Sequence, residues 1–342
     1  MKTLALILLA LLVPVAAVAD SGTVVVYNWS EYMPDAVMAA FQKETGIRVI
    51  YSTYDSNESM FAKIKLTTDG GYDIVFPSTY FVNRMRKEGM LTPIDRTRLH
   101  NFKNLDTALL DKPYDPGNAY SVPYLWGTTA IGVDADRVDP ATVTSWKDLW
   151  RPEFKGLVML SEDLRETLGV GLRLNGFSGN TTDPAQITAA YKTMATLIPS
   201  VRLFASDAQK QAFLNKEVII GVMWNGEAYI ASQENPQIRY IYPKEGPFIW
   251  LDSMVIPKGA KNVDNAYRFI DYLLRPDIAT LITTEIGYAS PNKAAVETLD
   301  AAVRNNPTVY PPKEILDRGE FQLDVGDAII EYEKAWQKLK TP

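Results

Sequence analysis

Hydrophobic and polar positions in the first part of the chain alternate between two periods. Apolar runs with the period of a strand are followed by stretches with the 3.6-residue period of an amphipathic helix. Such alternation is typical of a parallel sheet with helices on its faces. The predicted elements are a strand over 23–27, a helix from Pro34 to Gly46, a strand over 47–51, a helix that begins at Ser56 or Asn57, a strand over 72–76 and a helix from Ser78 to Gly89.

A second unit of the same kind begins after Gly132. Its predicted strands cover 157–160, 218–223 and 238–242. Its predicted helices cover 162–174, 263–274, 276–286 and 328–340. Two further helices are predicted to begin at Asp183-Pro184 and at Ser206 or Asp207. With 342 residues, the chain exceeds the ~250 to 300 at which single cores usually stop growing. Because no flexible linker separates the two units, we expect two lobes, a chain that crosses between them more than once, and a hinge.

The stretch from Pro247 to Pro257 reads as a buried strand that carries a carboxylate. Residues two apart in a strand point to the same face, so Trp250 and Asp252 project together. A buried carboxylate is costly unless a cation meets it. Taken alone, the stretch favours an ordinary alternative, in which Asp252 at a strand end pairs with a lysine or arginine or caps a turn, and Trp250 packs in the core.

Composition narrows the classes of protein. Residues 1–19 read as a secretory signal with an apolar run and a cleavage site after Ala19, and no later segment could span a bilayer. The chain has no cysteine, hence no disulfide and no thiolate metal site. Its formal net charge of −6 becomes −7 without Lys2, and it lacks basic runs, which argues against nucleic-acid binding. We therefore expect a soluble protein exported to a bacterial periplasm.

Aromatic and acidic residues follow several of the predicted strands. In open parallel sheets, ligands bind outside the carboxyl ends of the strands, so these residues would face one cleft. Each aromatic residue is by itself more typical of packing, and each acid of the favourable charge in a first helical turn. It is their shared position that indicates a site. The residues are Trp29, Tyr32, Tyr80, Asp163, Glu166 and Trp224.

Catalysis finds little support in the sequence. The one histidine, His100, lies in a polar stretch, and the sequence offers no second candidate for a Ser-His-Asp triad or a Cys-His dyad. Asp163 and Glu166 are one helical turn apart, too close to flank a glycosidic bond from two sides. No dinucleotide fingerprint and no metal-ligand spacing occurs. We expect no enzyme activity, no cofactor and no metal.

An aromatic cleft with several carboxylates suits a flexible organic polycation. Ammonium groups gain about 0.5 to 2 kcal/mol each on ring faces, and charge-assisted hydrogen bonds add roughly 1.5 to 3 kcal/mol each. Seven methylenes at ~0.8 kcal/mol contribute about 5 to 6 kcal/mol, short of the ~8 kcal/mol of micromolar binding. The carboxylates must supply the difference, and they disfavour neutral sugars.

Six motifs closely resemble the spermidine/putrescine-binding periplasmic proteins of ATP-binding-cassette importers. They are Tyr27-Asn28-Trp29-Ser30-Glu31-Tyr32, Glu44-Thr45-Gly46-Ile47, Pro77-Ser78-Thr79-Tyr80, Trp224-Asn225-Gly226, Pro243-Lys244-Glu245-Gly246 and Trp250-Leu251-Asp252-Ser253, and the likeness runs from 23 to 340. The resemblance implies an α/β fold of two lobes, a type II periplasmic binding protein in which each lobe is a mixed, mainly parallel sheet flanked by helices. It implies lobes of 20–130 plus about 250–298 and of 131–249 plus about 299–342, with hinges near 130 and 250.

The resemblance also implies the ligand contacts. Aromatic walls would be Trp29, Tyr32, Tyr80, Trp224, Trp250 and Tyr288, ammonium partners Asp163, Glu166 and Asp252, and polar contacts Ser30, Ser78 and Gln322. Tyr288 and Gln322 rest on the resemblance alone, and Ser30 stands where the family often has threonine. Glu166, Trp250 and Gln322 resemble the spermidine-preferring branch more than the putrescine-only branch.

We therefore expect a periplasmic receptor that closes on spermidine, and on putrescine as well, and presents it to the permease subunits of an importer. Three alternatives remain at this point. A ferric-ion or sugar receptor of the same fold would need converging tyrosine oxygens or a neutral pocket. A carbohydrate-active enzyme would show turnover. A ligand-sensing partner of a signalling protein would share the pocket and differ only in its partner.

Overall fold

The computed structural model describes residues 22–67 and 70–341, so the predicted signal over 1–19 lies outside the described residues. Their strands form one mixed ten-stranded sheet in the order β2-β1-β3-β9-β4-β7-β5-β6, with β10 paired to β9 and β8 to β4. The strands are β1 (Thr23–Trp29), β2 (Arg48–Tyr54), β3 (Ile74–Val75), β4 (Ser121–Asp134), β5 (Val158–Leu160), β6 (Val201–Phe204), β7 (Ile220–Trp224), β8 (Ile238–Ile241), β9 (Phe248–Val255) and β10 (Glu320–Phe321).

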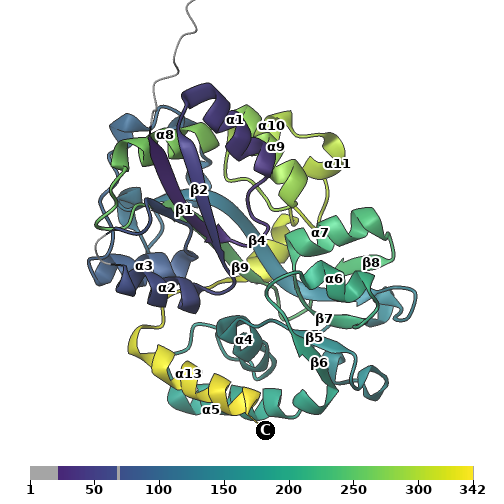
Figure 1. The fold of residues 1–342 in the computed structure, drawn as a ribbon. Coiled ribbons are helices and arrows are strands. Elements are labelled where there is room, and N and C mark those ends of the chain that lie inside the picture. Colours follow the sequence, from purple (N-terminus) through teal and green to yellow (C-terminus); the bar gives the residue numbers. More distant parts are fainter. Residues whose placement is uncertain (1–21, 68–69, 342) are drawn as a thin grey trace, which may run out of the picture.

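The N-terminal part of the sheet forms as the alternating pattern predicts. Strand β1 pairs in parallel with β2 and β3, and Gly46 ends the first helix in a left-handed conformation, with φ 71°. Figure 1 shows α1, α8, α9 and α10 above these strands, and α2 and α3 beside them. The helices of this part are α1 (Asp35–Thr45), α2 (Asn57–Leu66), α3 (Thr79–Lys87), α8 (Val263–Leu273), α9 (Pro276–Ile286) and α10 (Lys293–Thr298), and the short α11 (Ala301–Arg304) follows α10 in the chain.

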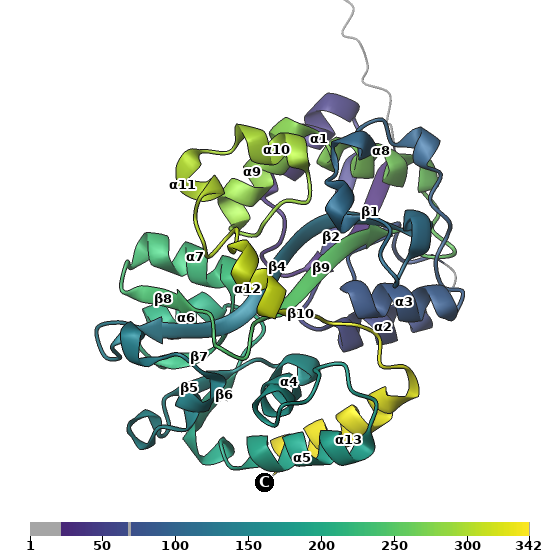
Figure 2. The ribbon, with the colours of Figure 1, turned by 180° about the vertical axis from the view of Figure 1, so that it is seen from behind.

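The other part of the sheet contains the parallel strands β5, β6 and β7. Helices α4, α5 and α13 pack together to the left of and below these strands in Figure 1, and α6 and α7 lie above them. Figure 2 shows α12 beside β10 on the opposite side of the molecule. These helices are α4 (Leu164–Leu174), α5 (Pro184–Ala195), α6 (Gln209–Leu214), α7 (Asn225–Glu234), α12 (Lys313–Arg318) and α13 (Ile329–Lys340), and short 3₁₀ turns connect many of the elements.

Two long antiparallel strands, β4 and β9, join the parts (Figure 2). One hydrophobic core includes the start of β4 up to Leu125 and β9 from Trp250 onward. A second core includes β4 from Ala130 onward and Phe248 on β9. The two largest cores lie on one continuous sheet, which confirms the predicted two-lobed α/β fold. We call the lobe of the first core the first lobe and the other the second lobe.

The structure corrects several predicted boundaries. Strand β4 has no counterpart in the predicted elements, because Pro123, Gly127 and Gly132 interrupt its apolar pattern. Helix α6 begins at Gln209, after Ala208, rather than at a serine or aspartate cap. Helix α4 begins at Leu164, two residues later than predicted. In the part of the chain that the structure describes, no helix is long and apolar enough to cross a membrane.

Candidate ligand-binding site

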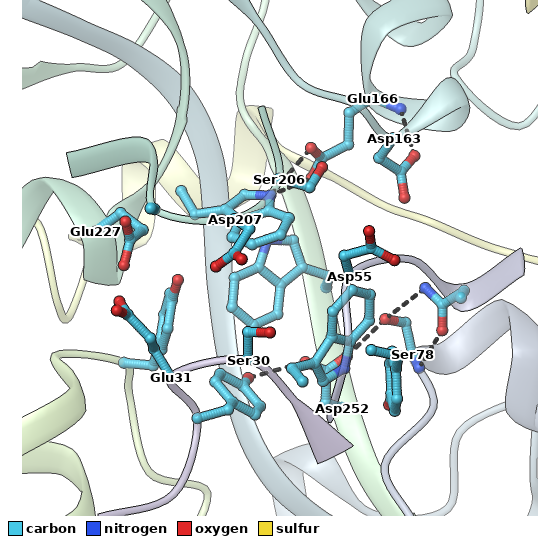
Figure 3. A pocket seen from close by; sticks show the side chains of 18 of the residues that line it. Ser30, Glu31, Asp55, Ser78, Asp163, Glu166, Ser206, Asp207, Glu227 and Asp252 are labelled. Carbon is cyan, nitrogen blue, oxygen red and sulfur yellow. Dashed lines mark hydrogen bonds between the residues drawn. The ribbon is translucent and has the colours of Figure 1, made fainter. Parts of the chain in front are cut away.

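A pocket with about 650 Å³ of empty volume, part of it open to solvent, lies where strands of both lobes end. We call it the interlobe pocket; Figure 3 shows its side chains converging from both lobes. Its lining is Trp29, Ser30, Glu31, Tyr32, Tyr54, Asp55, Asn57, Ser78, Asp163, Glu166, Ser206, Asp207, Ala208, Trp224, Glu227, Trp250, Asp252, Tyr288 and Gln322. Eleven of the twelve predicted ligand residues are among them.

The lining has an unbalanced charge. Seven of its nineteen residues are aspartate or glutamate and six are tryptophan or tyrosine. None of the described residues that line it is lysine, arginine or histidine. A pocket that gathers carboxylates without a basic residue in its own wall favours a cationic ligand, because the buried Asp163, Glu166 and Asp252 otherwise lack an ion-pair partner among the described residues.

Asp252 on β9 is held by the first lobe. Its Oδ2 accepts a hydrogen bond of 2.8 Å from the Tyr32 hydroxyl, and its Oδ1 accepts one of 2.6 Å from the Ser78 hydroxyl. Among the described residues, no lysine or arginine forms an ion pair with it, although its side chain is buried. The ordinary alternative for this stretch is therefore wrong about a basic partner of Asp252, although Trp250 does pack in the first core. Trp250 lines the same pocket, as the strand period predicts.

Burial raises the pKa of Asp252 to about 7, against the opposing effect of its hydrogen bonds from Ser78 and Tyr32; the negative charge of Asp163 raises it further. Ionisation of this carboxyl group is therefore less favourable than that of an exposed aspartate. An ammonium group placed beside it would stabilise the ionised form.

Glu166 lies in the first turn of α4, in the second lobe. Its carboxylate accepts hydrogen bonds from Thr129 Oγ1 at 2.5 Å, from Ser161 Oγ at 2.6 Å and from Trp224 Nε1 at 3.0 Å. Burial and the charge of Asp163 raise its pKa to about 8, although these three donors oppose the shift. The indole of Trp250 donates to the same Thr129 hydroxyl at 3.1 Å, so Thr129 links Trp250 to Glu166.

Asp163 is the N-cap of α4 rather than a residue inside the predicted helix. Its Oδ1 accepts from the backbone N–H groups of Arg165 at 2.7 Å and Glu166 at 3.0 Å, and its Oδ2 accepts from the Tyr80 hydroxyl at 3.3 Å. Burial raises its pKa. The cap therefore places Asp163 and Glu166 in the same pocket, as their shared position after a predicted strand indicates.

Tyr80 is the predicted ligand residue that does not line the interlobe pocket. It is buried, and its hydroxyl joins Asp163 to Asn57, whose amide donates to it at 3.2 Å. In this structure, Tyr80 orients a lining carboxylate rather than forming a wall.

The aromatic residues of the two lobes meet in the pocket. The rings of Trp29 and Trp224 stand edge to face with centroids 6.0 Å apart. The ring of Tyr288 also stands edge to face with those of Tyr32 and Trp250, with ring centroids 5.3 Å and 5.2 Å apart. These rings line the same pocket as the carboxylates, so methylene groups can pack against them and ammonium groups can meet π surfaces.

Several lining residues are missing from the sequence-based list: Glu31, Tyr54, Asp55, Asn57, Ser206, Asp207, Ala208 and Glu227. Tyr54 ends β2 and Asp55 follows it, so the same rule of strand ends that indicates Trp29 would have found them. Helix α7 begins directly after Trp224, and Glu227 lies in its first turn. Glu58 neighbours the lining residue Asn57 in the first turn of α2, and burial and the charge of Asp163 raise the pKa of Glu58 to about 8.

Within residues 22–67 and 70–341 there is no group of three or more histidine, cysteine, aspartate or glutamate side chains arranged to hold a metal ion. The lining carboxylates are thus dispersed around the pocket instead of meeting at one point. This dispersion suits a ligand with several separated positive charges.

The fold and the interlobe pocket are those of a type II solute-binding protein. Residues 36–311 match the family of bacterial extracellular solute-binding proteins. The chain is 51% identical to the spermidine/putrescine-binding periplasmic protein of Escherichia coli and 50% identical to that of Salmonella typhimurium, in each case over 332 residues, 97% of this chain and 95% of the relative. The structure of the spermidine/putrescine transporter substrate-binding protein of Streptococcus pneumoniae is similar with a TM-score of 0.79 and 36% identity, covering 93% of this chain and 98% of that one. The chain belongs to the family of bacterial extracellular solute-binding proteins.

Proposed function

We propose that this protein is a periplasmic receptor that binds spermidine, and putrescine as well, and delivers the polyamine to an ATP-binding-cassette importer. The observation that carries the proposal is the interlobe pocket itself, with seven carboxylate residues, six aromatic residues and no basic residue among the described residues that line it. The names of the close relatives in Escherichia coli and Salmonella typhimurium support the same ligand class.

Asp163, Glu166 and Asp252 are the proposed ammonium partners. Each is buried, none has a basic ion-pair partner among the described residues, and burial raises the pKa of each. A bound ammonium supplies the missing counter-charge in a site of low dielectric, where charge-assisted hydrogen bonds contribute roughly 1.5 to 3 kcal/mol each. The methylene chain between the ammonium groups packs against the aromatic walls, which include Trp29, Trp224 and Trp250.

The tyrosine hydroxyls argue against a ferric-ion receptor. The hydroxyl of Tyr32 donates to Asp252 and that of Tyr80 donates to Asp163, so neither converges on a common point as a metal ligand. Burial, together with the neighbouring carboxylate, raises the pKa of both phenols well above the ordinary value, which opposes formation of phenolates. A neutral sugar is disfavoured because it would leave the buried carboxylates without a counter-charge.

Closure of the two lobes is the proposed mechanism of capture. The partners come from both sides, with Asp252 in the first lobe and Glu166 in the second, so the polyamine binds the closed state better than the open one and shifts the equilibrium toward it. We place hinges near 130 and 250, where the hydrophobic core changes along β4 and β9. The corresponding lobes are 20–130 with about 250–298 and 131–249 with about 299–342.

Delivery to permease subunits and a periplasmic location follow from the same proposal. The relatives are named periplasmic, and the sequence over 1–19 has the pattern of a cleaved signal. We infer that the permease recognises the closed form. We also infer that the protein binds and releases its ligand unchanged, because its relatives in Salmonella typhimurium and Escherichia coli are named as binding proteins.

A calorimetric titration tests the proposal. Purified protein is titrated in turn with spermidine, putrescine, maltose and ferric citrate at one salt concentration. We expect saturable binding of the two amines and no heat of binding with maltose or ferric citrate. Binding of maltose or ferric citrate with neither amine bound would refute the proposed function.

A further inference from the structure

Lys210 stands between two acidic residues at one end of the interlobe pocket. Its ammonium group forms an ion pair with Glu31, which follows β1 in the first lobe, and lies 3.6 Å from Glu227 Oε1 on α7 in the second lobe. The backbone N–H of Lys210 also donates to Glu227 Oε2 at 2.9 Å. The Lys210 side chain is only 14% exposed and that of Glu227 only 13%, so a largely buried cation is fixed at this place.

Glu31 and Glu227 line the interlobe pocket, and Lys210 lies outside its lining. In Figure 3, these two glutamates lie together at one side of the pocket, while Asp55 and Asp163 lie at the opposite side and Asp207 and Asp252 between them. The carboxylates therefore extend from one side of the pocket to the other, and Lys210 neutralises the pair at one end.

The backbone around this ion pair is unusual. Glu31 has φ 51° and Ala208, two residues before Lys210, has φ 52°. Residues other than glycine avoid this left-handed region, and such residues concentrate at ligand clamps and switch regions. Both residues line the pocket, one from each lobe. The conformation carries Glu31 toward the second lobe and starts α6 so that Lys210 reaches it.

Lys210 remains positively charged in this position. Burial lowers its pKa, but the hydrogen bond to Glu31 and the charges of Glu227 and Glu31 outweigh burial and raise the pKa above its ordinary value. The protein therefore supplies its own ammonium group to the acidic residues at this end.

We propose that Lys210 is a specificity-determining residue that limits the length of the ligand: its ammonium group takes the carboxylates that a fourth amine would need, so that diamines and triamines bind and linear tetraamines are disfavoured. The inference rests on the proposed polyamine function. A fourth ammonium group at this end would meet a like charge and two carboxylates that are already paired. A diamine or triamine does not extend to this end of the pocket, so Lys210 stays paired with Glu31 and Glu227.

Lys210→Met removes the charge and keeps an unbranched stem. We measure the dissociation constants of putrescine, spermidine and spermine, the last as the tetraamine probe, by calorimetry at one salt concentration. We expect the wild type to prefer spermidine over spermine, and the spermidine-to-spermine affinity ratio to shift toward spermine by about tenfold or more in Lys210→Met, since two carboxylates become available. Lys216→Met, at an exposed pair with Asp136, is the matched control and should leave the ratio unchanged.

Glu31→Gln separates this role from a purely structural one. It breaks the ion pair between the lobes but leaves Lys210 charged beside Glu227, so it should not shift the ratio toward spermine. If Lys210 only holds the lobes together, Lys210→Met and Glu31→Gln will weaken all three amines by a similar factor, and the inference is overturned. Lys210→Gln, checked by circular dichroism, replaces Lys210→Met if the latter does not fold. A wild type that binds none of the amines would instead refute the proposed function, which is a different result.

Discussion

The Ser78 hydroxyl donates a 2.6 Å hydrogen bond to Asp252 although Ser78 occupies the N-cap position of α3. Serine at such a position ordinarily accepts a hydrogen bond from the helix backbone, and here its side chain makes no capping bond. The helix start therefore serves to position a donor at the pocket. The Ser78 hydroxyl therefore does not stabilise the start of α3, and instead holds a buried carboxylate 174 residues away in the sequence.

Ser78→Ala should weaken ligand binding more than folding. Loss of the donor raises the pKa of Asp252 further, because this hydrogen bond is one of the two that lower it. We expect spermidine affinity to fall by about tenfold and the pH at which binding is half-lost to rise, with little change in the thermal midpoint.

Ser56→Ala is the matched control, since Ser56 does cap its helix by accepting from the Ser59 N–H at 3.2 Å. It should lower the free energy of unfolding by about 1 kcal/mol and leave affinity unchanged. Equal effects of the two substitutions on affinity would contradict the role of Ser78.

Asp252→Asn should weaken spermidine binding by about 10- to 100-fold, because it replaces a charge-assisted pair with a neutral hydrogen bond. The fold should persist, since an uncharged side chain in this buried position costs no ionisation. Calorimetry measures the affinity and circular dichroism the fold. Asp136→Asn, at an exposed position, is the control. Unchanged spermidine affinity in Asp252→Asn would remove Asp252 from the proposed site.

Binding should release protons near neutral pH. The pKa of Asp252 is raised to about 7 and that of Glu166 to about 8 by burial, and the polycation pairs with the ionised forms. Affinity should therefore fall by about tenfold or more as the pH is lowered from about 8 to about 6. Titrations at pH 7 in two buffers with different ionisation enthalpies measure the proton release. An affinity that stays constant over this range would rule out the coupling.

The raised pKa values of Asp252 and Glu166 also affect the stability of the protein without ligand. Ligand affinity should rise with pH, whereas the free energy of unfolding without ligand should fall. Between the ordinary values of 3.8 and 4.5 and the raised values, the folded state binds more protons than the unfolded state. The free energy of unfolding should thus decrease as the pH rises from about 4 to about 8, and bound spermidine should remove this decrease. Thermal unfolding with and without spermidine measures both effects.

Gly127→Ala should disturb the pocket through β4. A Cβ atom at Gly127 would lie 2.2 Å from Asn225 Oδ1 and 2.6 Å from Trp250 Cζ2, too close for either group. We expect a loss of about 1 to 3 kcal/mol in the free energy of unfolding and weaker spermidine binding, because the Trp250 ring must shift. At Gly179, where the nearest atoms lie 3.4 Å away, alanine should be tolerated. Full affinity in Gly127→Ala would show that the Trp250 position is not critical.

Local sequence patterns predict much of the first lobe and part of the site. The parallel β1, β2 and β3, the end of α1 at Gly46 and the common face of Trp250 and Asp252 follow from periods and caps that depend on neighbours in the chain. The rule that ligands bind at strand ends brings Trp29 and Trp224 together correctly. Tyr288 and Gln322 had no such signal and depended on family resemblance.

The tertiary structure decided the features that join distant segments. Strand β4 forms despite Pro123, Gly127 and Gly132 because pairing with β9, β7 and β8 supplies its hydrogen bonds, which no local pattern encodes. Whether Ser78 caps a helix or binds Asp252, and whether Lys210 meets solvent or Glu31, depends on side chains that are neighbours only after folding. The sequence by itself determined the residue types and their periods, while packing of the two lobes determined their partners, because charge pairing and burial are properties of three-dimensional contact.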